Sequence, residues 1–153
     1  YIATIQTEKG DIVLELYPDV APLAVNSFIF LAENGWFDGV TFHRVIPGFV
    51  AQAGDPSGTG YGGPGYAFRN ESSPDYTFDG PGVLAMANAG ADSNGSQFFI
   101  TYAAASQLDG SYTVFGHVLA GMDVLESLDA RDTSANADLP PGDLILSVTI
   151  EQR

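Results

Sequence analysis

The sequence contains no cysteine. It therefore cannot form a disulfide framework, use a thiol nucleophile or bind a metal through thiolates. Histidine is almost as scarce, because His43 and His117 are the only two and lie far apart in the chain. The acidic segment 132–143 also lacks the ligand spacing of an EF-hand loop. The sequence therefore predicts no metal site.

Basic residues are also few in this sequence. There are five of them against 19 acidic residues, which gives a formal net charge of −14. A protein that binds a phosphate backbone needs clustered lysines and arginines. We therefore predict no nucleic-acid partner, and we interpret the acidity first as a solubilising surface.

Long hydrophobic runs are also missing. No apolar stretch approaches the 18 residues of a membrane span, so we expect no membrane contact by this chain. The sequence begins at Tyr1 rather than at methionine, which is compatible with a targeting segment or anchor removed before it. The compartment is left open between the cytoplasm and an extracytoplasmic domain of a processed or anchored precursor.

What is present is a glycine-rich, moderately hydrophobic chain. Its 153 residues are 45% hydrophobic and include 18 glycines and 9 prolines. This length suits one domain with one core, which buries roughly 68–70% of the surface of the unfolded chain. No repeat or linker divides the sequence. We predict a single domain over residues 1–153, rich in β structure and loops.

Periodicity places the individual elements. Alternation predicts strands at 1–7, 12–17, 83–88, 97–101, 111–118 and 144–150, and two more within 41–55. The last strand should turn Leu144, Leu146, Val148 and Ile150 to the core. Helices are predicted from about 22 to 34 and from 121 to 130. Strands without regular helical crossovers indicate a mainly antiparallel sheet that closes on itself.

The stretch 41–55 places one arginine and one glutamine on short apolar strands that are broken at Pro47-Gly48. Alternation puts Phe42 and Ile46 on the face of Arg44, and it puts Val50 on the face of Gln52. A guanidinium among apolar groups needs a compensating partner, because burial of an unpaired charge is costly and arginine cannot lose its proton to become neutral. Two interpretations remain open. Arg44 either pairs with a core carboxylate as a structural residue, or it donates hydrogen bonds to a substrate in an apolar cleft.

Residues 56–81 show no periodicity and form a long loop beside this stretch. Connections of this length are usually functional or disordered. The run 58–63 matches the G-x-G-x-x-G pattern, but Pro64 and Gly65 follow where a dinucleotide site needs a helix. Ser96 lies in Asn-Gly-Ser-Gln rather than in the G-x-S-x-G motif of many hydrolases. Both histidines are interpreted as structural, hydrogen-bonded side chains.

Several stretches together resemble the cyclophilin family of peptidyl-prolyl cis/trans isomerases, in particular its short-loop, bacterial-like members. They are the Arg44 stretch and residues 7–12, 21–22, 82–90, 94–101, 108–110 and 112–118. The resemblance covers nearly the whole chain. It implies a closed eight-stranded antiparallel β-barrel capped by two α-helices, with the active cleft on the outside of the barrel.

The resemblance also implies site residues. Arg44 matches the catalytic arginine, Phe49 the floor of the proline pocket, and Gln52 the glutamine that hydrogen-bonds the substrate. The other implied groove residues are Val50, Gly58, Ala87, Asn88, Ala89, Gln97, Phe99, Gln107, Leu108 and Tyr112. Three of these depart from the family: many members have methionine at Val50, tryptophan at Gln107 and histidine at Tyr112.

The implied function is acceleration of rotation about X-Pro bonds in protein substrates, without a cofactor, which would assist protein folding as a chaperone does. The implied partners are proline-containing peptides and unfolded or flexible protein segments, and the implied state is a monomer. A cyclosporin-type inhibitor should bind weakly, because Gln107 lacks the aromatic surface of tryptophan. The alternatives are a proline-peptide binding module with little turnover and, third, a hydrolase.

Overall fold

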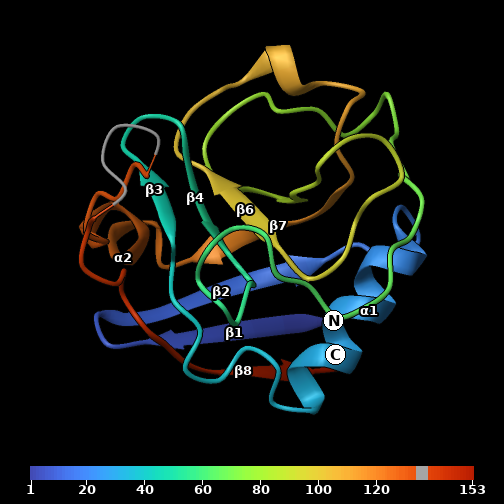
Figure 1. Ribbon diagram of the computed structural model, residues 1–153. Coiled ribbons are helices and arrows are strands. Elements are labelled where there is room, and N and C mark those ends of the chain that lie inside the picture. The colour runs from blue at the N-terminus through green and yellow to red at the C-terminus, as the bar shows by residue number, and fades with distance from the viewer. Residues whose placement is uncertain (134–137) are drawn as a thin grey trace.

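The computed structural model describes residues 1–133 and 138–153. Its centre is one antiparallel sheet in the order β3-β4-β6-β5-β7-β2-β1-β8, which curls into a half-barrel (Figure 1). The strands are β1 (Ile2–Thr7), β2 (Gly10–Leu16), β3 (Arg44–Ile46), β4 (Val50–Ala53), β5 (Val83–Met86), β6 (Phe98–Thr101), β7 (Val114–Ala120) and β8 (Ile145–Glu151). The mainly β architecture with eight antiparallel strands is therefore confirmed.

The sheet is open, so the prediction of a closed barrel was wrong. Its outermost strands, β3 and β8, do not pair with each other. The edge of β3 is occupied instead by a segment that follows the second helix, because Val45 and Arg131 exchange backbone hydrogen bonds of 2.9 and 2.8 Å. A second isolated bridge joins Thr41 to Leu144. Single bridges thus replace the ladder that would have closed the barrel.

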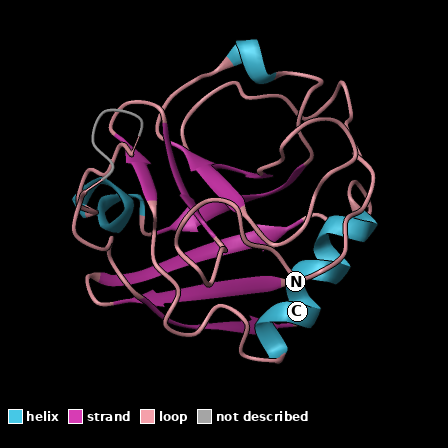
Figure 2. Cartoon of the chain, viewed as in Figure 1, coloured by secondary structure: helices cyan, strands magenta, loops and turns pink. Residues whose placement is uncertain are grey.

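Two helices flank the sheet, on opposite sides of the view in Figure 1. Helix α1 (Pro22–Glu33) begins at a proline, as predicted, and buries Phe28 and Leu31. Helix α2 (Met122–Ser127) is shorter than predicted because Leu128 is already extended, with φ −63° and ψ 143°. A 3₁₀ turn, η1, covers Ser106–Leu108. Figure 2 shows how much of the remaining chain is loop.

The inner face of the curled sheet holds the main core. Phe28, Phe37 and Phe98 are buried there, with ring centroids 5.1 to 5.7 Å apart. Phe42 belongs to the same core and is fully buried. Phe42 therefore does not lie on the face of Arg44, and the prediction from alternation was wrong at this residue. Strand β3 begins only at Arg44, so the period-two pattern does not extend back to Phe42.

Strand β8 corrects another predicted face. Ile145 and Val148 are buried, whereas Leu146 is 54% exposed and Leu144 is 36% exposed. The cause is a β-bulge: Gln6 faces Ser147 but Thr7 faces Ile145, which leaves Leu146 without an opposite residue. One extra residue in a strand reverses the side on which the preceding side chains lie.

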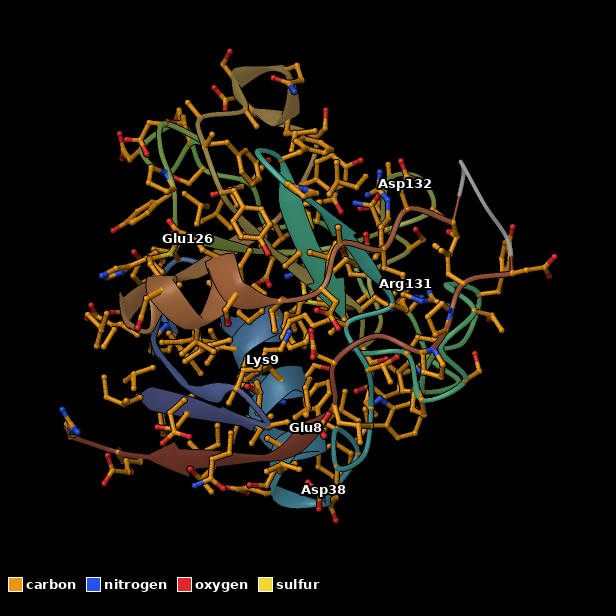
Figure 3. The ribbon with its side chains drawn as sticks, turned by 90° about the vertical axis from the view of Figure 1, so that its left-hand side faces the viewer. Glu8, Lys9, Asp38, Glu126, Arg131 and Asp132 are labelled. Atoms are coloured by element: carbon orange, nitrogen blue, oxygen red, sulfur yellow. The ribbon has the colours of Figure 1, made fainter. Side chains whose placement is uncertain are left out.

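The chain ends and the loops are tied to this frame. Ile2 pairs with Glu151, so the two ends of the chain lie side by side. Lys9, in the β1–β2 turn, lies beside α2 (Figure 3). It donates to Ser127 O, in the last residue of α2, at 2.8 Å and to Asp129 Oδ1 at 2.9 Å. The predicted polar loop 132–142 includes residues 134–137, which lie outside the described residues. No helix in the described parts of the chain is long and apolar enough to span a membrane.

Candidate active site

The candidate site lies on the outer face of the sheet, where β4 and β6 pair. On β4, Ala51 and Ala53 turn to the inner core, so Val50 and Gln52 turn outward. On β6, Phe98 and Ile100 turn inward, so Phe99 turns outward opposite Gln52. Val50 and Phe99 belong to a second apolar cluster, which also includes Phe78, Ala85 and Val114, and Gln52 is a polar side chain beside it. The pleat of two short strands thus separates the core from the site.

A cavity of about 340 Å³ opens over this second cluster. That volume lies within the range of small-molecule and peptide side-chain sites. Its walls are His43, Arg44, Phe49, Val50, Gln52, Thr59, Gly60, Tyr61, Ala87, Asn88, Phe99, Leu108, Tyr112 and Thr133. The lining combines apolar side chains, such as Phe49, Val50 and Phe99, with polar ones, such as Arg44, Gln52 and Asn88.

Arg44 is held in the wall of this cavity by a hydrogen bond to its cross-strand neighbour. Arg44 and Gln52 face each other across β3 and β4, and Arg44 Nη1 donates to Gln52 Oε1 at 3.3 Å. The guanidinium carbon lies 5.9 Å from the centroid of the Phe49 ring, within the range of a cation–π contact. The described hydrogen-bond partner is thus a neutral amide and not a carboxylate. This favours a substrate-facing Arg44 over a structural ion pair.

Gln52 is oriented in turn by Gln97. Gln52 Nε2 donates to Gln97 Oε1 at 3.0 Å. Gln97 Nε2 donates to two carbonyl oxygens of the long loop, Gly60 O at 2.9 Å and Gly62 O at 3.0 Å. A row of hydrogen bonds therefore runs from the loop through two amides to the guanidinium.

Three aromatic rings shape the apolar wall. Phe99 and Tyr112 meet edge to face with centroids 5.5 Å apart, and Phe78 stacks on Phe99 at 5.8 Å. Phe78 is buried and lies behind the wall. Such perpendicular and stacked contacts hold rings in fixed orientations. Tyr112, where the resembled family often has histidine, thus completes the aromatic wall.

A second cavity of about 310 Å³ adjoins the first. The two share Gln52, Gly60, Tyr61, Ala87 and Asn88. We call the two cavities together the groove, defined by the residues that line either of them. Ala89 and Gln97 line the second cavity only.

Most residues that the resemblance implied come together in the groove, but Gly58 and Gln107 line neither cavity. Gly58 donates its N–H to Asp55 O at 2.9 Å, and the next residue, Thr59, lines the first cavity. Gln107 is exposed in the 3₁₀ turn beside Leu108. In the first cavity, sequence reasoning missed five lining residues, which are His43, Thr59, Gly60, Tyr61 and Thr133.

His43 lines the groove in a position where burial disfavours the charged imidazolium. Burial lowers its pKa; nearby Asp55 opposes this shift, while Arg131 and Arg44 reinforce it. The ring is 4% exposed, and its Nδ1 has no hydrogen-bond partner among the described residues. The predicted structural role is matched in burial but not in hydrogen bonding, because Nδ1 has no partner among the described residues. Burial also opposes the charged form that a general base takes on when it accepts a proton.

Other chemistries find little support in the groove. Ser96 is buried, and its hydroxyl donates to Gly54 O at 2.6 Å, so it is not presented as a nucleophile. Within residues 1–133 and 138–153, no three His, Asp or Glu side chains gather as candidate metal ligands. The arrangement is suited to holding a peptide and donating hydrogen bonds from Arg44.

Comparison with known proteins gives a consistent result. The family model for cyclophilin type peptidyl-prolyl cis-trans isomerase matches residues 2–150. Peptidyl-prolyl cis-trans isomerase B of Streptomyces anulatus is 43% identical over 99% of this chain and 97% of its own length. Peptidyl-prolyl cis-trans isomerase ppi1 of Schizosaccharomyces pombe is 45% identical over 95% of this chain and 97% of its own length.

A solved structure agrees with these relatives. The cyclophilin type isomerase of Cryptosporidium parvum, crystallised in the presence of the dipeptide Ala-Pro, superposes with a TM-score of 0.90. It is 35% identical, and the alignment covers all of both chains. The family predicted from the sequence motifs is confirmed: the chain belongs to the cyclophilin-type peptidyl-prolyl cis-trans isomerases.

Proposed function

We propose that the groove binds a proline-containing segment and that Arg44 accelerates rotation about the X-Pro bond. The observation that carries this proposal is the position of Arg44, which lines the first cavity together with Phe49 and Phe99 and is oriented by Gln52. The Cryptosporidium relative was crystallised with Ala-Pro, which supports a proline dipeptide as the minimal ligand. Flexible segments of folding proteins are the natural source of such ligands.

The energy required limits what one residue can do. The uncatalysed amide barrier is about 20 kcal/mol, and relaxation takes roughly 10–100 s. A turnover of about 10³ s⁻¹ therefore needs roughly five decades, or about 7 kcal/mol. One hydrogen bond to a charged donor contributes about 1.5–3 kcal/mol. Arg44 alone is insufficient, so the groove must also bind the twisted amide better than the planar one.

The residues divide this work between them. Phe49, Phe99 and Tyr112 hold the proline ring, while the backbone around Asn88 and the Gln52 amide hold the flanking peptide. Arg44 donates to the proline nitrogen, whose lone pair localises as amide resonance is lost. No proton transfer, covalent step or cofactor is needed. We further infer that residues 1–153 act as one domain and as a monomer.

An isomerisation assay on a proline peptide tests the proposal. Arg44→Ala should lower turnover by two or more decades, roughly 2.7 kcal/mol or more, because the lost donor acts mainly in the twisted state. Arg44→Lys should recover little, since an ammonium lacks the planar fork. Peptide affinity should change by a smaller factor than turnover, and the melting temperature should change little. Arg69→Ala, which removes an exposed arginine that lines neither cavity, is the matched control.

The alternatives give different results in the same assay. A binding module would bind the peptide without accelerating isomerisation, and a hydrolase would cleave it. A structural Arg44 would show a large drop in melting temperature, because its loss would strand a buried partner. Near-normal turnover of Arg44→Ala would overturn the proposed mechanism.

Gln107 carries a proposal about inhibitors. It is exposed beside Leu108, which lines the groove, and it offers neither the apolar area nor the indole donor of tryptophan. A cyclosporin-type ligand should therefore bind weakly, and Gln107→Trp should tighten it. Titration of both proteins with the ligand checks this. Nanomolar affinity of the unchanged protein, or no gain from tryptophan, would show that this position does not control binding.

A further inference from the structure

Asp55 is a fully buried carboxylate two residues after β4. Its described partners are N–H and O–H groups of the loop 57–62 rather than basic side chains. It accepts from Ser57 N and Oγ at 2.8 and 2.7 Å, from Thr59 Oγ1 at 3.4 Å, from Gly60 N at 2.8 Å and from Gly62 N at 3.0 Å. These donors outweigh the effect of burial and lower the pKa of Asp55 to about 2.

The loop wraps closely around this carboxylate. A Cβ atom on Gly62 would overlap Asp55 Oδ1, so only glycine allows the approach. The N–H groups of Gly60 and Gly62 point to Asp55, and the carbonyls of the same two residues receive Gln97 Nε2. The carboxylate thus fixes the two acceptors that orient the Gln97 amide.

The orientation of each amide then determines the next. Both N–H bonds of Gln97 are used by the loop, so its oxygen faces Gln52 and accepts from Gln52 Nε2. The Gln52 oxygen consequently faces Arg44 and accepts from Nη1. Reversal of either amide would set a donor against a donor.

We propose that Asp55 is a positioning residue: through the carbonyls of Gly60 and Gly62 it orients Gln97 and Gln52, and so the guanidinium of Arg44. The proposal rests on the function proposed above for Arg44. Asp55 itself lines neither cavity. Its effect should therefore be on turnover more than on peptide affinity.

Asp55→Asn tests the role of the charge. Asparagine keeps the shape but has one acceptor oxygen, so its NH₂ group must face N–H or O–H donors of the loop. We expect turnover to fall between about 10-fold and 100-fold, the scale of a misplaced catalytic group, with a much smaller change in peptide affinity. Loss of affinity without loss of turnover would overturn the proposal.

A double-mutant cycle separates positioning from other effects. If Asp55 acts through Arg44, then Asp55→Asn in the Arg44→Ala background should lower the remaining turnover by less than about threefold. A full additional loss in that background would overturn the proposal. Arg44→Ala alone tests the proposed function: normal turnover there refutes that function, whereas a large loss there with normal turnover of Asp55→Asn refutes only the present inference.

Two further variants guard against misfolding. Asp143→Asn is the control, because Asp143 is also buried and accepts Asp129 N at 2.7 Å but lies outside the groove. It should lower stability without lowering turnover per folded molecule. If Asp55→Asn does not fold, Gln97→Met removes the same amide link with little change in shape. Gln97→Met should lower turnover when Arg44 is present and have little effect in the Arg44→Ala background. A full additional loss in the Arg44→Ala background would again overturn the proposal.

Discussion

At the scale of single residues, the groove depends on groups whose charge states are set by burial and hydrogen bonding. The His43 ring and the Asp55 carboxylate both lie close to Gly60, because Gly60 N donates to Asp55 and a Cβ at Gly60 would contact His43. Burial lowers the pKa of His43, and donors lower the pKa of Asp55. The first shift favours the uncharged imidazole and the second favours the ionised carboxylate.

Asp55 gives a prediction for acid stability. Its folded pKa of about 2 lies below the ordinary value of 3.8, so folding favours the ionised form. The resulting stability is present above about pH 4 and is lost as the pH falls toward 2. Urea unfolding at pH 5 and at pH 3 should show a larger loss of unfolding free energy for the wild type than for Asp55→Asn. Equal losses would mean that other carboxylates cause the acid sensitivity.

The same residues show what sequence reasoning can find. Arg44, Phe49, Gln52 and Phe99 lie in motifs that carry the family pattern, and they converge in space. Thr59, Gly60 and Tyr61 were not predicted to line the groove, because the loop has no periodicity and its conformation depends on hydrogen bonds to Asp55. Thr133 reaches the groove because Arg131, two residues before it, exchanges backbone hydrogen bonds with Val45. Such contacts between distant segments leave no local signal.

At the scale of elements, α1 takes its N-terminal cap from elsewhere in the chain. Ala21, at the N-cap, has no side chain that can bond, and the first turn contains no acidic residue. Glu71 of the long loop accepts from Leu23 N at 3.0 Å and from Ala24 N at 2.9 Å. A carboxylate at this end also interacts favourably with the helix dipole.

Glu71→Ala should therefore destabilise the protein by about 1–2 kcal/mol, the usual cost of losing a cap. Urea denaturation measures this change. Glu33→Ala provides the control, because Glu33 is an exposed acidic residue at the opposite end of the same helix, where negative charge is unfavourable. It should be neutral or slightly stabilising. Equal destabilisation by both variants would contradict the capping role of Glu71.

Element boundaries also mark the limits of prediction. Pro22 correctly indicated the start of α1, and alternation correctly located β1, β2 and the strands around the groove. Alternation failed in β8, where the bulge at Leu146 depends on the register with β1. The prediction of a closed barrel failed for a related reason. The partner of β3 is the segment at Arg131, and pairing of remote segments cannot be deduced from the pattern of either one.

At the scale of the whole molecule, the few positive charges hold the acidic surface together locally. Lys9 bridges Asp129 and Asp143, and Arg153 pairs with Glu151. Arg131 donates to His43 O and to Pro140 O, at 2.6 and 2.8 Å. These contacts are short-ranged, and the net charge of −14 remains. Stability at low ionic strength is therefore a competition between local attraction and overall repulsion.

We expect repulsion to dominate, because surface pairs are worth only about 0–1 kcal/mol each, whereas excess acidic charge repels across the whole fold. The Debye length falls from about 30 Å at 0.01 M salt to about 8 Å at 0.15 M, from the size of the molecule to that of neighbouring side chains. Added NaCl over this range should screen long-range repulsion more than local pairs.

The melting temperature should then rise by about 2–4 °C, which corresponds to about 1 kcal/mol for a chain of this size. Differential scanning calorimetry at neutral pH, at the two salt concentrations, measures it. Lys9→Met separates the two contributions, because it removes the Asp129 and Asp143 pairs and makes the net charge one unit more negative. Its melting temperature should rise more steeply with salt than that of the wild type. A fall in melting temperature for the wild type would show that the local pairs outweigh repulsion, and that the acidic surface is stabilised mainly by its few cations.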